Sequence, residues 1–252
     1  MKTAKAWKIW AAKEPYYAVI TSEKYLAANQ SAEVLEDFFS SGELHLANIF
    51  EQIKAKVDAN FQPTRALDFG CGTGRVLLPL GKCCESAVGV DVSEEMLAEA
   101  QHNAEQRENL SNVQLLTTAQ FVADESISYD FVHSHIVFQH IRPKQGEALV
   151  AQLLQRLQSG GVSALQFVYR WQAPVHRRLL TWLKNRIPGA QAVARLVWNN
   201  PHLVAPMEMN SYSVNRLLFL HKEQGMVDLH AKLSEHLGIH WITIYAKKGI
   251  VE

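Results

Sequence analysis

The stretch ALDFGCGTGRVLLPL, residues 66 to 80, joins a short apolar run, a glycine-rich loop and the start of an apolar helix. Glycines let the backbone turn tightly and let a ligand approach the peptide groups without a Cβ in the way. We therefore expect a strand, a ligand-binding loop and a helix in this order, which is the first unit of an α/β fold.

The same alternation of strand and helix continues to residue 170. Expected strands are Ala66 to Phe69, Ala87 to Val90, Val113 to Thr117, Tyr129 to His135 and Val162 to Tyr169, with helical segments between them. Near the end, Val227 to Leu233 and His240 to Lys247 predict an antiparallel hairpin. The pattern predicts a doubly wound α/β fold with a seven-stranded sheet closed by that C-terminal hairpin.

The flanking segments read as helical. Residues 1–62 predict an N-terminal helical cap, with one break near Glu14 and Pro15 and another where Ser40 would cap a helix with Glu43 as its partner. Residues 63–252 form the expected core domain. Within it, residues 171–212 contain several prolines and predict a lid-like helical insertion after strand five.

The composition excludes several classes of protein. Lys plus Arg and Asp plus Glu both number 25 in 252 residues, so no net charge draws the chain to nucleic acid or an anionic membrane. No apolar run reaches the roughly 18 residues of a membrane span, and lysines interrupt the apolar start, so we expect a cytoplasmic protein. The cysteines, Cys71, Cys83 and Cys84, predict reduced thiols and no metal site.

Two features separate the glycine loop from a dinucleotide site. Asp68 precedes Gly70 by two residues, and a buried carboxylate there would repel a pyrophosphate but suit a positively charged amino-acid moiety. The loop also reads G-x-G-x-G rather than G-x-G-x-x-G. Both features favour a sulfonium cofactor.

A second carboxylate follows at the end of the next expected strand. Asp91 lies 17 residues after Gly74 and can accept hydrogen bonds from the two hydroxyls of a ribose. Ser93 can cap the helix that follows, which would bring Met96 to the adenine side. A dinucleotide enzyme shares this carboxylate, so Asp91 indicates a nucleoside without selecting the cofactor.

With these motifs the chain resembles a class I, Rossmann-like methyltransferase of the small-molecule type. LDFGCGTG and GVDVSEEML resemble the first two cofactor motifs of that family, YDFVHSHIVFQHI its fourth-strand motif, and LQSGGV the turn before strand five. The resemblance covers roughly residues 65 to 170 and the final hairpin. It implies S-adenosyl-L-methionine as the cofactor and S-adenosyl-L-homocysteine as the product.

The resemblance also implies a set of cofactor contacts. The methionine part would lie among Asp68, Gly70, Gly72 and Gly74, the ribose at Asp91 and the adenine at Met96, with Cys71, Thr73, Val92 and Ser134 completing the site. One position departs from the family. Where the third strand often ends in an aspartate, this chain has Thr118, Ala119 and Gln120, so backbone groups or Gln120 would meet the adenine.

Methyl transfer requires an aligned nucleophile and little water. The candidates for catalysis are His135 and His133, which strand alternation places on one face with Ser134 on the other. His140 aligns with a histidine common in the family, and hydrogen bonding within the core explains it better than catalysis.

An anionic acceptor is one reading of the basic segment after strand five, which holds Arg170, Arg177 and Arg178. A solvated helix face is the other reading, and the commoner one. Tyr16, Tyr17 and Tyr212 could line an acceptor pocket, although packing explains them equally well.

The leading hypothesis is therefore a methyltransferase acting on a small molecule, glycan or lipid precursor, with oxygen as the acceptor atom. A catalytically silent S-adenosylmethionine-binding module or partner subunit is the alternative, and an NAD-dependent oxidoreductase is disfavoured by Asp68 and the glycine spacing. Nucleic acid is not expected as a partner, because the segment after the fourth strand lacks the Asn/Asp-Pro-Pro-aromatic motif of amino-methylating enzymes.

Overall fold

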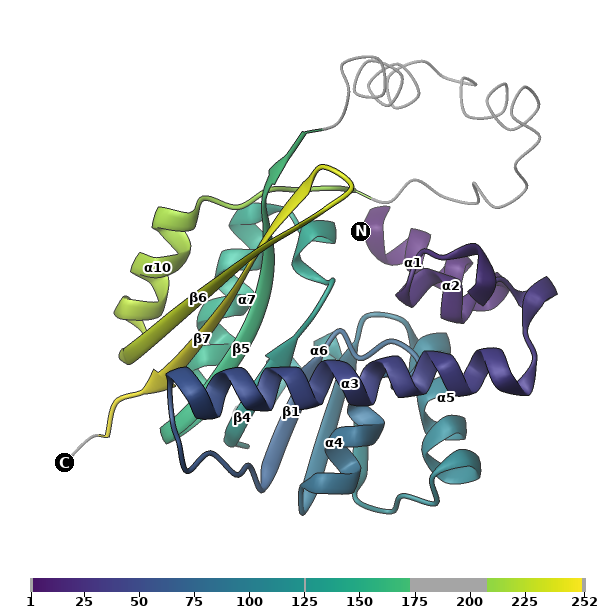
Figure 1. Cartoon of the computed structure of the whole chain (residues 1–252), viewed down its shortest axis with the longest axis horizontal. Coiled ribbons are helices and arrows are strands. Elements are labelled where there is room, and N and C mark those ends of the chain that lie inside the picture. Colours follow the sequence, from purple (N-terminus) through teal and green to yellow (C-terminus); the bar gives the residue numbers. More distant parts are fainter. Residues whose placement is uncertain (1, 125, 173–207, 251–252) are drawn as a thin grey trace.

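The computed structural model describes residues 2–124, 126–172 and 208–250. Its seven-stranded sheet has the order β3-β2-β1-β4-β5-β7-β6 (Figure 1). The strands are β1 (Arg65–Phe69), β2 (Ser86–Asp91), β3 (Val113–Thr117), β4 (Tyr129–Ser134), β5 (Leu157–Trp171), β6 (Met226–His236) and β7 (Ile239–Lys248). Strands β1 to β5 pair in parallel, and β7 and β6 add antiparallel. The predicted doubly wound sheet with its C-terminal hairpin is confirmed.

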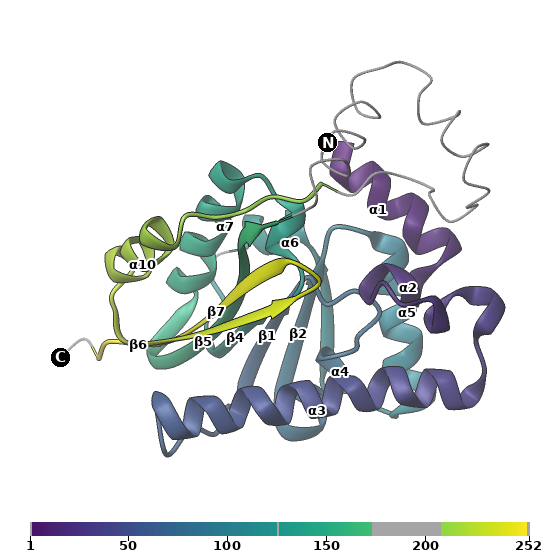
Figure 2. The same cartoon turned by 45° about the horizontal axis from the view of Figure 1, so that its top comes forward.

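Helices cover both faces of this sheet (Figures 1 and 2). One face carries α3 (Ala32–Lys56), α4 (Leu77–Cys83) and α5 (Glu94–His102), and the other carries α6 (Thr118–Ala123), α7 (Pro143–Gln155) and α10 (Val214–Glu223). Neighbouring strand residues alternate between the two layers: Ala66 and Phe131 pack in the α3 layer, whereas Leu67 and Val132 pack in the α7 layer. Strand alternation thus buries both faces, as parallel sheets require.

Two N-terminal helices, α1 (Lys2–Lys13) and α2 (Pro15–Val19), lie beside α5, at the edge of the sheet where the parallel strands end (Figure 1). Pro15 opens α2 at a position where its missing N–H costs nothing, so the expected break at Glu14 and Pro15 is present. Trp10 and Ala18 are buried against Met96 of α5. The N-terminal helices therefore cover the part of the sheet edge where a ligand is expected.

The expected break at Ser40 is wrong, because α3 is one continuous helix of 25 residues. Its N-cap is Ser31, whose Oγ accepts a hydrogen bond from the Val34 N–H at 3.3 Å. Ser40 lies in the middle of the helix and donates to Glu36. Tertiary packing decides here, since the apolar stripe of α3 stays buried along the helix: Phe38 packs against Tyr16 and Leu78, and Leu46 and Ile53 pack on the sheet.

The packing of α3 is closest at Gly42. A Cβ built on this glycine would lie 1.9 Å from the carbonyl oxygen of Arg75, the residue that follows the glycine loop. The absence of a side chain at this position therefore lets the helix rest directly on that loop.

The insertion expected over residues 171–212 falls mainly on residues 173–207, which lie outside the described part of the chain. The residues around it are placed: β5 runs to Trp171, and the N–H of Tyr212 donates to the carbonyl of Val168 at 2.8 Å. None of the helices in the described ranges is long and apolar enough to cross a membrane.

Candidate active site

The glycine loop is folded back against the end of β2. The N–H groups of Gly70 and Cys71 both donate to the carbonyl of Val90, at 2.7 and 3.1 Å. Gly70 has φ +79°, and a Cβ there would lie 2.2 Å from the Val137 side chain, which follows β4. Only glycine fits this position, since both the backbone conformation and the space exclude a larger residue.

Asp91 completes β2 beside the loop. Its Oδ2 accepts a hydrogen bond from the N–H of Gly72 at 3.0 Å, and its Oδ1 accepts one from the N–H of Ser93 at 2.9 Å. Burial raises the pKa of this carboxyl, and the backbone hydrogen bonds oppose that rise. The carboxylate is thus oriented by backbone donors and keeps lone pairs for a ligand.

A cavity of about 470 Å³ opens over the loop and Asp91. Its walls come from α1 and α2, from the ends of β2 and β4, and from α5, α6 and α7. They include Trp7, Val19, Met96, Thr118, His135, His140, Gln145 and Gln152. Apolar walls with a few convergent polar groups are typical of small-molecule and cofactor sites.

Five of the residues predicted to bind the cofactor line this cavity, namely Gly70, Gly72, Asp91, Val92 and Met96. The other seven are not among its described lining residues: Asp68, Cys71, Thr73, Gly74, Ala119, Gln120 and Ser134. Thr118, at the start of α6, is the residue of the adenine segment that reaches it.

The side chains outside the cavity have other partners. Gln120 closes a capping box, its Oε1 accepting from the N–H and Oγ of Thr117 at 2.8 and 2.9 Å. Ser134 donates to the carbonyl of Phe69 at 2.9 Å. The Cys71 thiol is buried behind the loop, and burial raises its pKa well above the usual range. These residues shape the loop and its neighbours rather than the cavity wall.

A cluster of histidines lies between β4 and α3. His133 is 1% exposed, and its Nδ1 lies 2.8 Å from Oδ1 of the buried Asp68. Its Nε2 lies 3.1 Å from Nε2 of His45, a residue of α3. The His45 ring in turn packs on His135, with ring centroids 4.0 Å apart. The carboxylate of Asp68 therefore has His133 as its hydrogen-bond partner, on the α3 side of the sheet.

Burial keeps the outer rings of this cluster neutral. Burial, together with smaller contributions from His133 and Arg75, lowers the pKa of His45 to about 2. Burial, assisted by His45, Arg75 and His133, also holds the pKa of His135 well below its usual range. Nδ1 of His135 lies 3.3 Å from the Arg75 guanidinium, which can only donate. The proton of the neutral His135 ring is therefore on Nε2, which can donate to a ligand oxygen.

The residues predicted to touch an acceptor lie in different places. His140 lines the cavity, packs edge-on against Trp7 and donates its Nδ1–H to the carbonyl of Glu208 at 2.8 Å. Tyr17 packs on Trp10, and Tyr212 donates to the carbonyls of Phe138 and Ile141 inside the core. Arg170 is exposed at the end of β5, and Arg177 and Arg178 lie outside the described residues.

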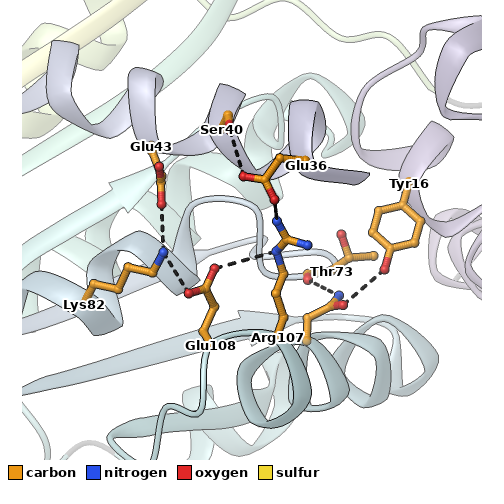
Figure 3. A network of polar contacts seen from close by, with 9 residues as sticks. Tyr16, Glu36, Ser40, Glu43, Thr73, Lys82, Arg107 and Glu108 are labelled. Atoms are coloured by element: carbon orange, nitrogen blue, oxygen red, sulfur yellow. Dashed lines mark hydrogen bonds and ion pairs between the residues drawn. The ribbon is translucent and has the colours of Figure 1, made fainter. Parts of the chain in front are cut away.

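Tyr16 joins α2 to the glycine loop (Figure 3). Its hydroxyl lies 2.6 Å from Oε1 of Glu99 and 3.2 Å from Oδ1 of Asn103, whose Nδ2 donates to the carbonyl of Thr73 at 3.0 Å. Burial and Glu99 raise the pKa of the Tyr16 hydroxyl. Tyr16 is thus a buried anchor for the N-terminal helices rather than a wall of the cavity.

A second polar network in Figure 3 fastens α3 to the same side of the sheet. Lys82 of α4 lies 2.8 Å from both Glu43 of α3 and Glu108, and Arg107 pairs with Glu36 of α3. The side chains are partly exposed, so each pair contributes little by itself. Together they fix the position of the helix that carries His45.

Sequence reasoning missed three contributors: Trp7 of α1, His45 of α3 and Arg75 after the loop. Trp7 and His45 come from helices whose distance from the sheet no local pattern encodes. For Arg75 a signal existed, because this arginine directly follows the glycine loop in the sequence.

Comparison with known proteins agrees with this arrangement. Residues 66–161 match a family described as a methyltransferase domain. The chain is 32% identical over 115 residues to a ubiquinone biosynthesis O-methyltransferase of Ruegeria sp., covering 46% of this chain and 45% of that protein. It is 29% identical over 132 residues to a carboxy-S-adenosyl-L-methionine synthase 1 of Yersinia pseudotuberculosis, covering 50% and 54%. The chain thus spans about half the length of these curated relatives.

Solved structures agree in fold. A magnesium protoporphyrin IX methyltransferase from Synechocystis, crystallised with bound SAM, superposes with a TM-score of 0.61 at 15% identity, over 99% of this chain and 98% of that one. The sequence matches and the fold together confirm the resemblance on which the cofactor motifs were interpreted.

Proposed function

We propose that this chain, a member of the class I, S-adenosylmethionine-dependent methyltransferases, binds that cofactor in the 470 Å³ cavity and methylates a small molecule. The observation that carries the proposal is the carboxylate of Asp91, held by the N–H groups of Gly72 and Ser93 at the rim of a cavity whose floor is the glycine loop. A ribose needs such an oriented acceptor pair.

The residues present fit the cofactor. At Gly70 and Gly72 a Cβ would lie 2.2 and 2.7 Å from the side chains of Val137 and Val19, so glycine at both positions lets these two valines of the cavity wall pack directly on the loop. Asp91 would hold the ribose, and Met96 and Thr118 the adenine. When bound, S-adenosylmethionine supplies a methyl group on a cationic sulfur, which a nucleophile displaces in line.

The acceptor is proposed to meet the cofactor at His135, with oxygen as its reactive atom. His135 lies at the carboxyl end of β4 and lines the cavity, and with Nδ1 of its neutral ring accepting from Arg75, its Nε2–H can donate a hydrogen bond to the acceptor oxygen. Because the pKa of His135 is lowered, the ring is a weak base, and its proposed role is to orient the acceptor hydroxyl. His133, Asp68 and His45 support it from the α3 side. Trp7 and Val19 would help to exclude water.

The experiment that tests the cofactor is a thermal shift measurement on the whole chain. S-adenosylhomocysteine should raise the melting temperature, and NAD at the same concentration should not. Stabilisation by NAD alone would overturn the proposal in favour of an oxidoreductase. Release of S-adenosylhomocysteine from S-adenosylmethionine in the presence of hydroxylated acceptors then distinguishes an enzyme from a silent binding module.

A further inference from the structure

A second cavity, of about 520 Å³, lies between α3 and the face of β5, β7 and β6. It shares His135 and Ile136 with the first cavity, so the two adjoin at the end of β4. Ile136 has φ +61°, a strained conformation for a β-branched residue, and this turn directs the chain between the two cavities.

Arg75 lines the second cavity and not the first. It is 6% exposed, and its guanidinium has only long contacts, 3.4 Å from Ser41 Oγ and 3.3 Å from Nδ1 of His135. Its buried Nε has no hydrogen-bond partner among the described residues. The charge of Asp68 favours the protonated guanidinium, but no described carboxylate lies within ion-pair distance of it. A buried charge in this condition is costly unless something pairs with it.

The remaining lining combines apolar side chains, among them Ile20, Leu44 and Ile49, with polar and cationic ones. Lys232 of β6 stands at the wall and contacts Asn48 of α3 at 3.4 Å, and hydroxyls are supplied by Ser41, Ser234 and Thr243. The other titratable groups facing the space are His45, His135 and Tyr245. No Asp or Glu belongs to the lining that the structure describes. The cavity therefore offers two cations and several hydrogen-bonding groups to a ligand of negative charge.

We propose that Arg75 binds an anionic group, a carboxylate or a phosphate, of a ligand held in the second cavity next to His135. This inference rests on the proposed function for the identity of that ligand, because two participants in the reaction can carry such a group. One is the methyl acceptor, and the other is the cofactor through its own carboxylate. The lining favours the acceptor, since Arg75 and Lys232 face the second cavity and Asp91 faces the first.

Isothermal titration at constant ionic strength distinguishes the two sources. Wild type, Arg75→Gln and Arg75→Lys are titrated with S-adenosylhomocysteine and with 5′-methylthioadenosine, which lacks the amino-acid carboxylate. The same proteins are titrated with 4-hydroxyphenylacetate and with its neutral amide, each with and without S-adenosylhomocysteine. Lys232→Gln tests the second cation, and Lys222→Gln, an exposed lysine of α10 outside both cavities, is the matched control.

For an acceptor anion, Arg75→Gln should weaken 4-hydroxyphenylacetate by about tenfold and leave both nucleosides unchanged, with Arg75→Lys intermediate. For the cofactor carboxylate, Arg75→Gln should weaken S-adenosylhomocysteine by a similar factor and spare 5′-methylthioadenosine. Two outcomes would overturn the inference. In the first, wild type binds the acid no better than the amide, and S-adenosylhomocysteine no better than 5′-methylthioadenosine. In the second, wild type shows such a preference and Arg75→Gln keeps it.

The same titrations test the proposed function independently of the anion site. If neither nucleoside binds wild type, the cofactor assignment is wrong, while the acid and amide titrations without nucleoside still decide the anion site. Circular dichroism establishes whether Arg75→Gln is folded. If it is not, the comparison uses Arg75→Lys, which keeps the positive charge.

Discussion

The N–H of Gly72 donates a hydrogen bond to Oδ2 of Asp91 across 3.0 Å, so the glycine loop and the end of β2 fix each other. Oδ1 of the same carboxylate is held by the N–H of Ser93. The carboxylate that we propose for the ribose is therefore oriented by the protein itself, which would reduce the ordering cost of binding.

Replacing Asp91 by alanine should weaken the binding of S-adenosylhomocysteine by about tenfold or more, because two charge-assisted hydrogen bonds to the ribose are lost. Isothermal titration measures the affinity, and circular dichroism checks the fold. Asp228→Ala, an exposed aspartate of β6 that lines neither cavity, should bind normally. Unchanged affinity in Asp91→Ala would refute the ribose assignment.

Asp68→Asn should keep the affinity for S-adenosylhomocysteine within about threefold and lower the free energy of unfolding by about 1–3 kcal/mol. The reason is that Asp68 bonds to His133 inside the protein and is not part of the cavity wall. Titration and urea denaturation give the two quantities. A large loss of affinity in a stable variant would instead support the contact with the methionine part that the family resemblance implies.

Gly70→Ala should destabilise the protein more than Gly160→Ala. The two glycines share a positive φ, +79° and +76°, but an added Cβ meets Val137 at 2.2 Å at Gly70 and finds nothing within 4 Å at Gly160. Denaturation of both variants separates the clash, about 1–3 kcal/mol, from the backbone strain. Adding Val137→Ala to Gly70→Ala should recover part of the lost stability. Equal stability of Gly70→Ala and Gly160→Ala would show that the glycine loop shifts to relieve the clash at no cost.

Acid should destabilise the protein through His221, a buried residue of α10. Burial lowers its pKa to about 4, whereas the unfolded chain takes up this proton near pH 6.5. The unfolded state therefore binds more protons between these values, and stability falls as the pH drops through that window. His221 should account for about 2 kcal/mol of the loss between pH 7 and pH 5.

Urea denaturation at the two pH values measures this loss. His221→Leu should reduce the difference between them, and His102→Gln, which changes an exposed histidine, should leave it as in wild type. An unaltered difference in His221→Leu would assign the acid sensitivity to other groups.

The sequence predicted the sheet well because the periodicity of apolar residues and the positions of turn residues are local properties of the chain. The expected third strand has the observed bounds, Val113 to Thr117, and the hairpin lies where two apolar runs flank Leu237 and Gly238. The error at Ser40 has a physical origin: a serine followed by glutamate resembles a cap, but packing against the sheet carries the helix through it.

The site was less accessible to sequence reasoning. Asp91 could be located because its role depends on the end of one strand. Asp68 occupies the motif position, yet its carboxylate meets His133 from a neighbouring strand and faces α3. The contact of His133 with His45 joins residues 88 positions apart, and no periodicity in either segment encodes it.

The width of the second cavity is set by a residue that no ligand would touch. With only a hydrogen at position 42, α3 sits against the Arg75 backbone, and a single methyl group there would force the helix outward. Ser41 and His45, which line the cavity, lie on the same rigid helix and would move with it. A substitution at position 42 would therefore change the shape of the second cavity through the helix, without changing any residue that lines it.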